Sequence, residues 1–266
     1  MNRLSAFFSR PSAIFLMAAA MLLVASTAGL GQQPTTSAPS AGAPLSDAGE
    51  ILKRADAATK KLKSIRYKCE HKASGALENR LPPVSGTVVM SGDKNELGLA
   101  KFRLEARTQT PGSKVPINVT ALSDGREYLF VDVDTRTLHA GASVEVLGPR
   151  GNSALFGVMR ELFLPEPFKD ELGARKLEFK GIDKIGAEEC YKIHVVYKDE
   201  GSESNWWFSR GDFLPRRVER TMDIGNKQIG VSDLILTDVA VDPKFVDDPF
   251  KLLISEEFIR SADPAP

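Results

Sequence analysis

The sequence predicts an α+β domain made mainly of antiparallel strands, folded as an incomplete, half-open β-barrel with an N-terminal helix and a short helical lid. Apolar and polar residues alternate along several stretches, which is typical of strands with one solvated face. Turn residues separate these stretches, and few connections are long enough for a parallel crossover. A single sheet of about ten or eleven strands is expected to curl, and the helices then cover its open side.

The first 30 residues have the pattern of a secretory signal peptide. Arg3 and Arg10 precede an uncharged run, residues 13–30, that is rich in Ala, Leu, Met and Val. Small residues at positions 25–29 offer a cleavage region, and no cysteine follows the run to accept a lipid. The run is only slightly shorter than the roughly 20 residues that span a bilayer, so an uncleaved inner-membrane anchor is the alternative. Both alternatives predict an exported, periplasmic protein.

The remaining chain is expected to divide into a linker and one domain. Residues 31–44 carry no charge and no aromatic side chain, which predicts a flexible linker. Residues 45–266 are long enough for a single β-rich domain with a sizeable core. Without the signal peptide the chain has 33 basic and 35 acidic residues, a net charge of −2. This balance gives no basic field for a nucleic-acid partner.

The domain is expected to begin with an amphipathic helix. Asp47 and Glu50 have the spacing of a capping box. Apolar residues then recur every three or four positions and form one stripe: Ile51, Ala55, Ala58, Leu62 and Ile65. The stripe needs a sheet to lie on.

A series of strands is expected after the helix. Over residues 65–73 the odd positions share one face and the charged even positions share the other. Asp124 and Gly125 predict a hairpin turn between two of the later strands. The strands after the first one are expected at residues 84–90, 101–108, 115–122, 126–132, 137–140, 175–180, 190–197, 205–209, 215–222 and 227–241.

One very apolar stretch interrupts the strands. Five large apolar residues have helical spacing within residues 152–164, and Pro165 and Pro167 follow them. The pattern predicts a short helix, which we interpret as the lid.

The stretch NWWFSRGDFLPRR, residues 205–217, places three aromatic residues in a row before a turn. Alternation places Trp206 and Phe208 on one strand face and Trp207 on the other, so one large side chain is expected near the surface. Arg-Gly-Asp stands where a hairpin needs a turn, and we interpret it as a turn rather than as an adhesion signal. The basic clusters at residues 60–63 and 216–220 are expected to be solvated.

Four short motifs occur in an order that resembles a known family. They are Phe-Arg-Leu-Glu at 102–105, Ser-Asp-Gly-Arg-Glu-Tyr-Leu-Phe at 123–130, Gly-Ala-Glu-Glu-Cys-Tyr at 186–191, and the Trp to Leu-Pro segment at 207–215. Together they look like the periplasmic outer-membrane lipoprotein carrier superfamily, the LolA-like proteins. The Arg-Pro pair that precedes the Phe-Arg strand in true carriers is absent, since residues 91–96 read SGDKNE. The resemblance therefore implies a divergent member with an open barrel, a helical lid and a hydrophobic cavity.

The function implied is periplasmic binding or carriage of a hydrophobic ligand, a lipid or a lipoprotein acyl chain, without catalysis. Each methylene removed from water is worth roughly 0.8 kcal/mol, so apolar walls and a lid are sufficient. The expected walls are Tyr67, Phe102, Leu104, Tyr128, Phe130 and Trp207. The expected lid residues are Leu155, Phe156, Met159 and Phe163. The same residues also fit ordinary core packing, and the sequence does not distinguish a filled interior from a hollow one.

Other chemistries find little support in the sequence. His71, His139 and His194 fall on separate strands without a second ligand at zinc spacing, so no metal is expected. No phosphate loop, Gly-x-Ser-x-Gly elbow or His-Glu-x-x-His motif occurs, so no enzyme and no cofactor is expected. Cys69 and Cys190 are compatible with one disulfide in an oxidising location, or with two buried free thiols.

Two further classes of function stay open. The first is an envelope protein-interaction or sensing module on the same scaffold, without a lipid ligand. The second is a hydrolase without a recognisable motif. The expected partners are therefore a lipid or acylated protein, an envelope protein, and a membrane in transient contact.

Overall fold

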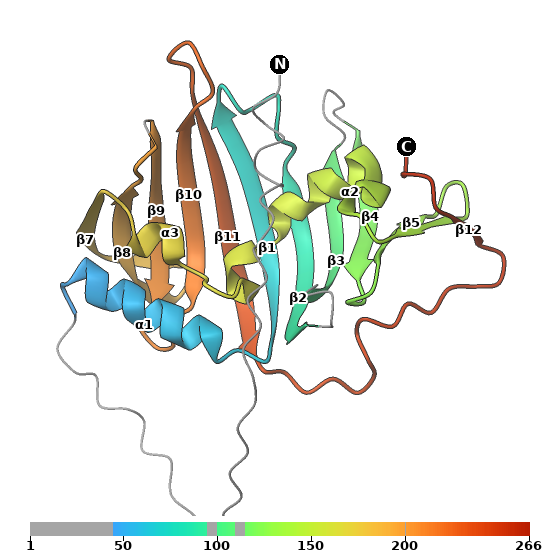
Figure 1. The fold of residues 1–266 in the computed structure, drawn as a ribbon, viewed down its shortest axis with the longest axis horizontal. Coiled ribbons are helices and arrows are strands. Elements are labelled where there is room, and N and C mark those ends of the chain that lie inside the picture. The colour runs from blue at the N-terminus through green and yellow to red at the C-terminus, as the bar shows by residue number, and fades with distance from the viewer. Residues whose placement is uncertain (1–44, 95–99, 110–114, 200) are drawn as a thin grey trace, which may run out of the picture. The chain divides into compact units, whose positions relative to one another are not determined.

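One open sheet of twelve strands organises the part of the chain that the structure describes (Figure 1). The computed structural model describes residues 45–94, 100–109, 115–199 and 201–266, so the predicted signal peptide and linker lie outside it. The strand order is β12-β6-β5-β4-β3-β2-β1-β11-β10-β9-β8-β7. The prediction of a mainly antiparallel sheet is confirmed. The predicted number of strands, ten or eleven, is too low, because β12 was not predicted.

The sheet consists of two antiparallel meanders. The first contains β1 (Ser64–Gly75), β2 (Val84–Lys94), β3 (Ala100–Gln109), β4 (Pro116–Ser123), β5 (Tyr128–Asp132) and β6 (Thr137–Gly141). The second contains β7 (Lys176–Ile185), β8 (Glu188–Val196), β9 (Ser202–Ser209), β10 (Pro215–Asp223) and β11 (Ile229–Val241). Antiparallel pairing of β1 with β11 joins the meanders, and β12 (Ile259–Ser261) lies parallel to β6. The predicted meander order is right within each half, but not for the join between them.

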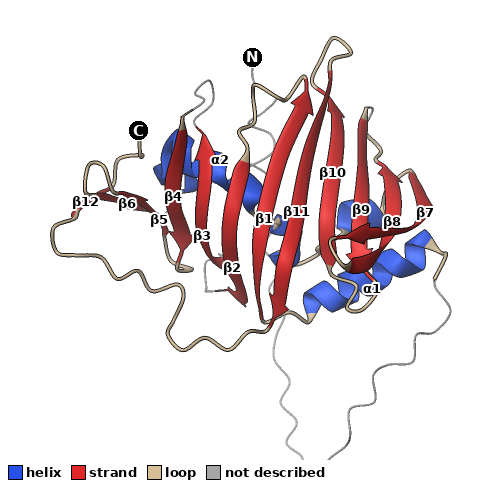
Figure 2. Cartoon of the chain, turned by 180° about the vertical axis from the view of Figure 1, so that it is seen from behind, coloured by secondary structure: helices blue, strands red, loops and turns tan. Residues whose placement is uncertain are grey.

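Residues 142–175, which we call the crossover, connect the two meanders. Because β6 lies close to one edge of the sheet and β7 forms the other edge, the crossover must traverse one face. It does so in short helical pieces: η2 (Val144–Leu147), α2 (Gly148–Ala154), η3 (Leu155–Gly157), η4 (Arg160–Phe163) and α3 (Lys169–Leu172). The helices cover the near face of the sheet in Figure 1, and the opposite view in Figure 2 shows the sheet in front of them. We call the covered face the inner face and the other the outer face.

Helix α1 (Ala48–Lys60) shares the inner face with the end of the crossover, where it contacts η4, α3 and β7. The Asp47 side chain accepts a hydrogen bond from the Glu50 backbone N–H at 2.7 Å, which makes one half of the predicted capping box. Ile51, Leu52 and Ala55 on its apolar stripe are fully buried. The predicted helix is therefore confirmed, with Ile51 and Ala55 of its stripe buried, while Leu62 and Ile65 lie beyond its end at Lys60.

Strand β1 follows the predicted period of two. Ile65, Tyr67, Cys69 and His71 are buried, while the charged residues between them are exposed. The register aligns Tyr67 with residues of the neighbouring strands that are also buried on the inner face. The apolar sides of the strands thus form one continuous inner wall.

The predicted lid helix over residues 152–164 is wrong as a single helix. Regular α-helix ends at Ala154, and the chain becomes extended at Val158 and Met159 between two 3₁₀ turns. The physical reason is competition for backbone groups. The Tyr67 hydroxyl accepts from the Met159 N–H at 2.9 Å and donates to the Gly157 carbonyl at 3.4 Å, so these groups point to the sheet.

The expectation that one large aromatic side chain of β9 lies near the surface is also wrong. Trp206 and Phe208 lie on the inner face and Trp207 on the outer face, as the alternation predicted, but all three are buried. The Lys192 ammonium and the Arg217 guanidinium lie 4.8 and 4.4 Å from the Trp207 ring centroid. The indole N–H also donates to the Asp183 carboxylate at 3.1 Å. Long charged side chains therefore cover this ring on the solvated face.

The basic cluster at residues 216–220 is not uniformly solvated either. Arg216 is buried and forms ion pairs with Asp212 at 2.7 Å and Glu188 at 2.9 Å. A register shift between Pro215 and Arg217 accompanies this burial. Arg220 lies on the inner face, opposite Ser204.

The structure contradicts a disulfide between Cys69 and Cys190, because both cysteines are free and buried. Cys69 is on β1 and Cys190 on β8, four strands away. At a strand spacing of about 4.8 Å this places them on the order of 19 Å apart, far beyond the reach of a disulfide. Their side chains also lie on opposite faces of the sheet. Two buried thiols are therefore the correct alternative.

The C-terminal tail contacts both the sheet and the crossover. Phe250 and Ala265 are buried, and Leu252 packs against a small apolar cluster on the outer face. The Ala265 N–H donates to the Val146 carbonyl at 3.0 Å. Within the described residues, no helix combines the length and apolar character that a bilayer crossing requires.

Candidate functional site

The candidate site is the space between the inner face and the crossover. Five of the six predicted wall residues come from β1, β3 and β5 and share this face: Tyr67, Phe102, Leu104, Tyr128 and Phe130. Trp207 does not belong to this wall, because it lies on the outer face beneath Lys192 and Arg217. The predicted lid residues lie in the crossover, on η3, η4 and the extended link between them.

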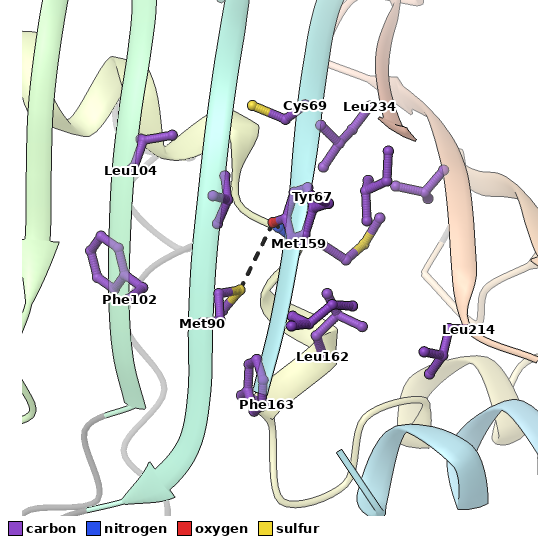
Figure 3. Packing of buried hydrophobic residues seen from close by; sticks show 14 of the residues in the cluster. Tyr67, Cys69, Met90, Phe102, Leu104, Met159, Leu162, Phe163, Leu214 and Leu234 are labelled. Carbon is purple, nitrogen blue, oxygen red and sulfur yellow. Dashed lines mark hydrogen bonds between the residues drawn. The ribbon is translucent and has the colours of Figure 1, made fainter. Parts of the chain in front are cut away.

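The site is filled by the chain's own side chains. Tyr67, Leu104 and Phe130 are at most 2% exposed, and Met159 is 1% exposed. Figure 3 shows Met159, Leu162 and Phe163 packed beside Tyr67 and Met90. Leu155 and Phe156 are half-buried, so they lie nearer the rim of the crossover. The structure therefore has the filled interior rather than the hollow one.

Tyr67 fixes the crossover to the centre of the sheet. Its hydroxyl bonds Met159 and Gly157 of the crossover and lies 3.8 Å from the Met90 sulfur. Complete burial raises the pKa of this hydroxyl well above its ordinary value, so it stays protonated. A neutral hydroxyl can donate and accept at once, which this contact requires.

Gly157 brings the crossover backbone down onto β1. A Cβ atom at this position would lie 2.7 Å from the Cys69 sulfur and 3.1 Å from Val84. Only glycine leaves room for this approach. Burial raises the pKa of the Cys69 thiol to about 11, so the sulfur acts as a small apolar group here.

Phe156 covers His71 at the rim of the site. The two rings stack with centroids 5.2 Å apart and an interplanar angle of 20°. The imidazole lies within hydrogen-bond distance of the Pro82 carbonyl, 3.1 Å, and of the Ser232 hydroxyl, 2.9 Å. Burial lowers the pKa of His71, which favours the neutral ring in this stack.

An aromatic cluster fills the other half of the inner face. The Phe168 ring stands edge-on to Trp206 and to Phe208, with centroids 5.3 Å away in each case. Trp206 and Phe208 are themselves stacked, 5.7 Å apart. The sequence prediction missed Phe168, although its place after two prolines of the crossover was a signal for a residue that anchors a turn to the core.

A polar cluster lies beside these aromatic rings and was also missed. Arg220 donates to Glu161 of the crossover at 2.9 Å, and Tyr197 donates to Glu171 at 2.7 Å. Burial and the nearby Glu161 charge raise the pKa of Glu171 to about 7. The signal in the sequence was a glutamate within the most apolar stretch of the crossover.

Two clefts open near the ends of the sheet. One of about 340 Å³ lies at the ends of β1, β2 and β3, lined by residues that include His71, Val84 and Thr108. The other, about 220 Å³, lies between Leu45 and the bulge of β7. Neither lining includes any of the ten predicted ligand-binding residues. Among the described residues, no three His, Cys, Asp or Glu side chains gather as a metal site.

Solved structures resemble this chain at low sequence identity. LprF from Mycobacterium bovis is 14% identical with a TM-score of 0.48, and the match covers 77% of this chain and 97% of LprF. The lipoprotein LppX from Mycobacterium tuberculosis is 16% identical with a TM-score of 0.46, covering 75% of this chain and 97% of LppX. No protein-family model and no curated protein matches the sequence.

MucB is similar in fold at a TM-score of 0.50 and 11% identity. The match covers 77% of this chain and 62% of MucB, so the chain spans less than two thirds of that protein. At this identity the likeness shows the fold alone. The chain therefore shares its fold with MucB.

Proposed function

We propose that this protein is a periplasmic binding or carrier protein for a hydrophobic ligand, a lipid or a lipoprotein acyl chain, and that it performs no catalysis. The ligand takes the place of the crossover side chains on the inner face. The signal-peptide pattern of residues 1–30 supports export.

The observation that carries this proposal is the way the crossover covers the inner face. It does so with short turns and an extended link rather than a continuous helix, so its internal backbone hydrogen bonds close single turns, such as Val158 N–H to the Leu155 carbonyl at 2.9 Å and Leu162 N–H to the Met159 carbonyl at 3.3 Å. Its attachment to the sheet includes the Tyr67 hydroxyl and the ion pair between Arg220 and Glu161. A cover held in this way can move as a segment while the sheet stays intact.

The free energy gained by burying an acyl chain is sufficient to displace the crossover from the inner face. At roughly 0.8 kcal/mol for each methylene, a chain of about fourteen methylenes gains on the order of 11 kcal/mol when it is fully buried. The side chains that it displaces lose part of their own burial, and Leu155 and Phe156 lose least because they are only half-buried. The filled structure is then the ligand-free, closed form.

A fluorescence titration tests this proposal. Exported, delipidated protein is titrated with N-phenyl-1-naphthylamine, a neutral apolar fluorophore, and we expect saturable binding at one site. Phe156→Asp places a charge in the crossover and is expected to weaken binding at least tenfold. Val133→Asp is the matched control, because Val133 is 70% exposed and its substitution leaves binding unchanged. A folded protein that shows no saturable binding would contradict the proposal.

A protein-interaction or sensing module is the second candidate, and the filled inner face favours it. A packed interior needs no ligand for stability, and the outer face and rim remain available to a partner. MucB itself has been solved in complex with MucA(peri). Failure to bind the fluorophore, together with capture of a specific envelope protein, is the result expected from this candidate.

A further inference from the structure

Arg220 places a positive charge on the inner face, beside the aromatic cluster of Trp206, Phe208 and Phe168. Arg220 lies opposite Ser204 on β9, next to the pair Val218 and Trp206. Its guanidinium carbon is 5.3 Å from the Trp206 ring centroid. The arginine therefore belongs to the wall that the crossover covers.

The ion-pair partner of Arg220 comes from the crossover. The guanidinium donates to the Glu161 carboxylate at 2.9 Å, and the two side chains are 24% and 11% exposed. Glu161 belongs to η4, two residues after Met159, whose backbone Tyr67 holds. Any movement that lifts this part of the crossover takes the carboxylate away from Arg220.

Arg217 on the same strand shows the contrast. It is paired with Asp233 on β11 and with Glu219 on β10, on the outer face. These partners belong to the sheet, so the charge of Arg217 stays paired when the crossover moves. Arg220 alone of these two arginines depends on the cover.

The second carboxylate of the polar cluster is held elsewhere. Glu171 accepts a hydrogen bond from Tyr197, whose hydroxyl also lies 2.9 Å from the Ser204 hydroxyl. Burial and the charge of Glu161 disfavour the ionised form of Glu171 by raising its pKa to about 7. Glu161, and not Glu171, is therefore the carboxylate in hydrogen-bond contact with Arg220.

We propose that the ligand is an anionic amphiphile, and that its carboxylate or phosphate head replaces Glu161 on Arg220 while its acyl chain replaces the crossover side chains. This inference rests on the proposed function. An arginine left unpaired in a partly buried site costs free energy. A neutral lipid that opens the crossover breaks the pair between Arg220 and Glu161 and provides no new partner for the arginine. An anionic head restores a charge-assisted hydrogen bond of the same kind.

The test is displacement of N-phenyl-1-naphthylamine from exported, delipidated protein at pH 8. Laurate is compared with methyl laurate, and an acyl lysophosphatidate with the monoacylglycerol of the same chain. We expect each anion to bind about tenfold to a hundredfold more tightly than its neutral analogue. The larger of the two affinity ratios, anion over neutral analogue, identifies the preferred head group as carboxylate or phosphate.

Variants make the result specific to Arg220. Arg220→Gln is expected to bring both ratios to about one. If this single variant does not fold, the neutral pair Arg220→Gln with Glu161→Gln is expected to do the same. Glu161→Gln is expected to strengthen anion binding, because it frees the arginine. Arg217→Gln removes a charge from the outer face of the same strand and is expected to leave the ratios unchanged.

Two results would overturn the inference, and they differ from each other. If the fluorophore binds but anions and neutral analogues displace it equally, Arg220 does not select the head and the proposed function still stands. If the folded protein binds neither fluorophore nor lipid, the proposed function fails and this inference fails with it.

Discussion

The phenol oxygen of Tyr67 on β1 accepts a hydrogen bond from the backbone N–H of Met159, 92 residues later in the chain, at 2.9 Å. This contact joins the centre of the sheet to the segment that covers it. It also explains why the crossover is not a continuous helix, because the Gly157 carbonyl and the Met159 N–H bond the sheet instead of other turns of the crossover. Removing this one hydroxyl group therefore tests how stably the crossover is held on the sheet.

Removing that hydroxyl is expected to loosen the crossover. Tyr67→Phe loses two hydrogen bonds and leaves a buried N–H without its partner, which costs about 1–3 kcal/mol of unfolding free energy. Urea unfolding measures this loss, and we expect faster hydrogen exchange at residues 157–159. Tyr128→Phe is the matched control on the same face, with a change under about 0.5 kcal/mol, since Tyr128 is only half-buried. Equal effects of the two substitutions would argue against the anchoring role.

Gly157 is expected to tolerate no side chain. Gly157→Ala places a methyl group 2.7 Å from the Cys69 sulfur and is expected to cost about 1–3 kcal/mol. Adding Cys69→Ala removes the sulfur and should recover much of this loss, which a double-mutant cycle measures. At Gly211 the nearest atom would be 3.7 Å away, so Gly211→Ala is the control with little change. Additive effects at Gly157 and Cys69 would show that the clash is not the cause.

Glu171 is expected to make stability depend on pH. Its pKa is raised from 4.5 to about 7 in the folded protein, so the folded state holds the proton more tightly than the unfolded state. Stability from this group is fully present below about pH 4.5, falls as pH rises, and is lost above about pH 7. Glu171→Gln removes the titration and should stabilise the protein by on the order of 3 kcal/mol at pH 8, and much less at pH 5. Urea unfolding at the two pH values checks this, and an equal gain at both would contradict it.

The two cysteines are expected to be unreactive in the native protein. Burial raises the pKa of Cys69 to about 11 and that of Cys190 to about 12, so neither forms much thiolate at pH 8. A colorimetric thiol reagent should detect almost no reaction before denaturation and two thiols after it. Detection of no thiol in denatured, unreduced protein would instead demonstrate an oxidised form.

Local periodicity was sufficient to predict most of the fold. Alternation over residues 65–73 gave the buried face of β1, and the stripe of α1 followed from its apolar spacing. The break at Val158 was not predictable in this way, because apolar residues spaced for a helix can equally lie along an extended link on a flat wall. The parallel pairing of β12 with β6 depends on segments more than 120 residues apart, and periodicity carries no information about such pairs.

The site was predictable only for its apolar part. Tyr67, Phe102 and Leu104 follow from strand alternation, and the structure places them on one wall. The pair Arg220 and Glu161 was not predicted, since 59 residues separate its members and a charged residue in an alternating strand is normally on the solvated face. Trp207 was wrongly predicted as a wall residue. It is buried on the outer face by Lys192 and Arg217, and its aromatic character alone does not reveal on which face it is buried.

Hydrogen–deuterium exchange of the crossover with and without laurate at saturation tests most directly whether a ligand replaces the cover. If the acyl chain takes the place of residues 155–163, the Met159 amide loses its bond to Tyr67, and exchange there should become at least tenfold faster while β1 and β3 stay protected. Saturating laurate that leaves exchange at Met159 unchanged, or slows it, would contradict a ligand site on the inner face.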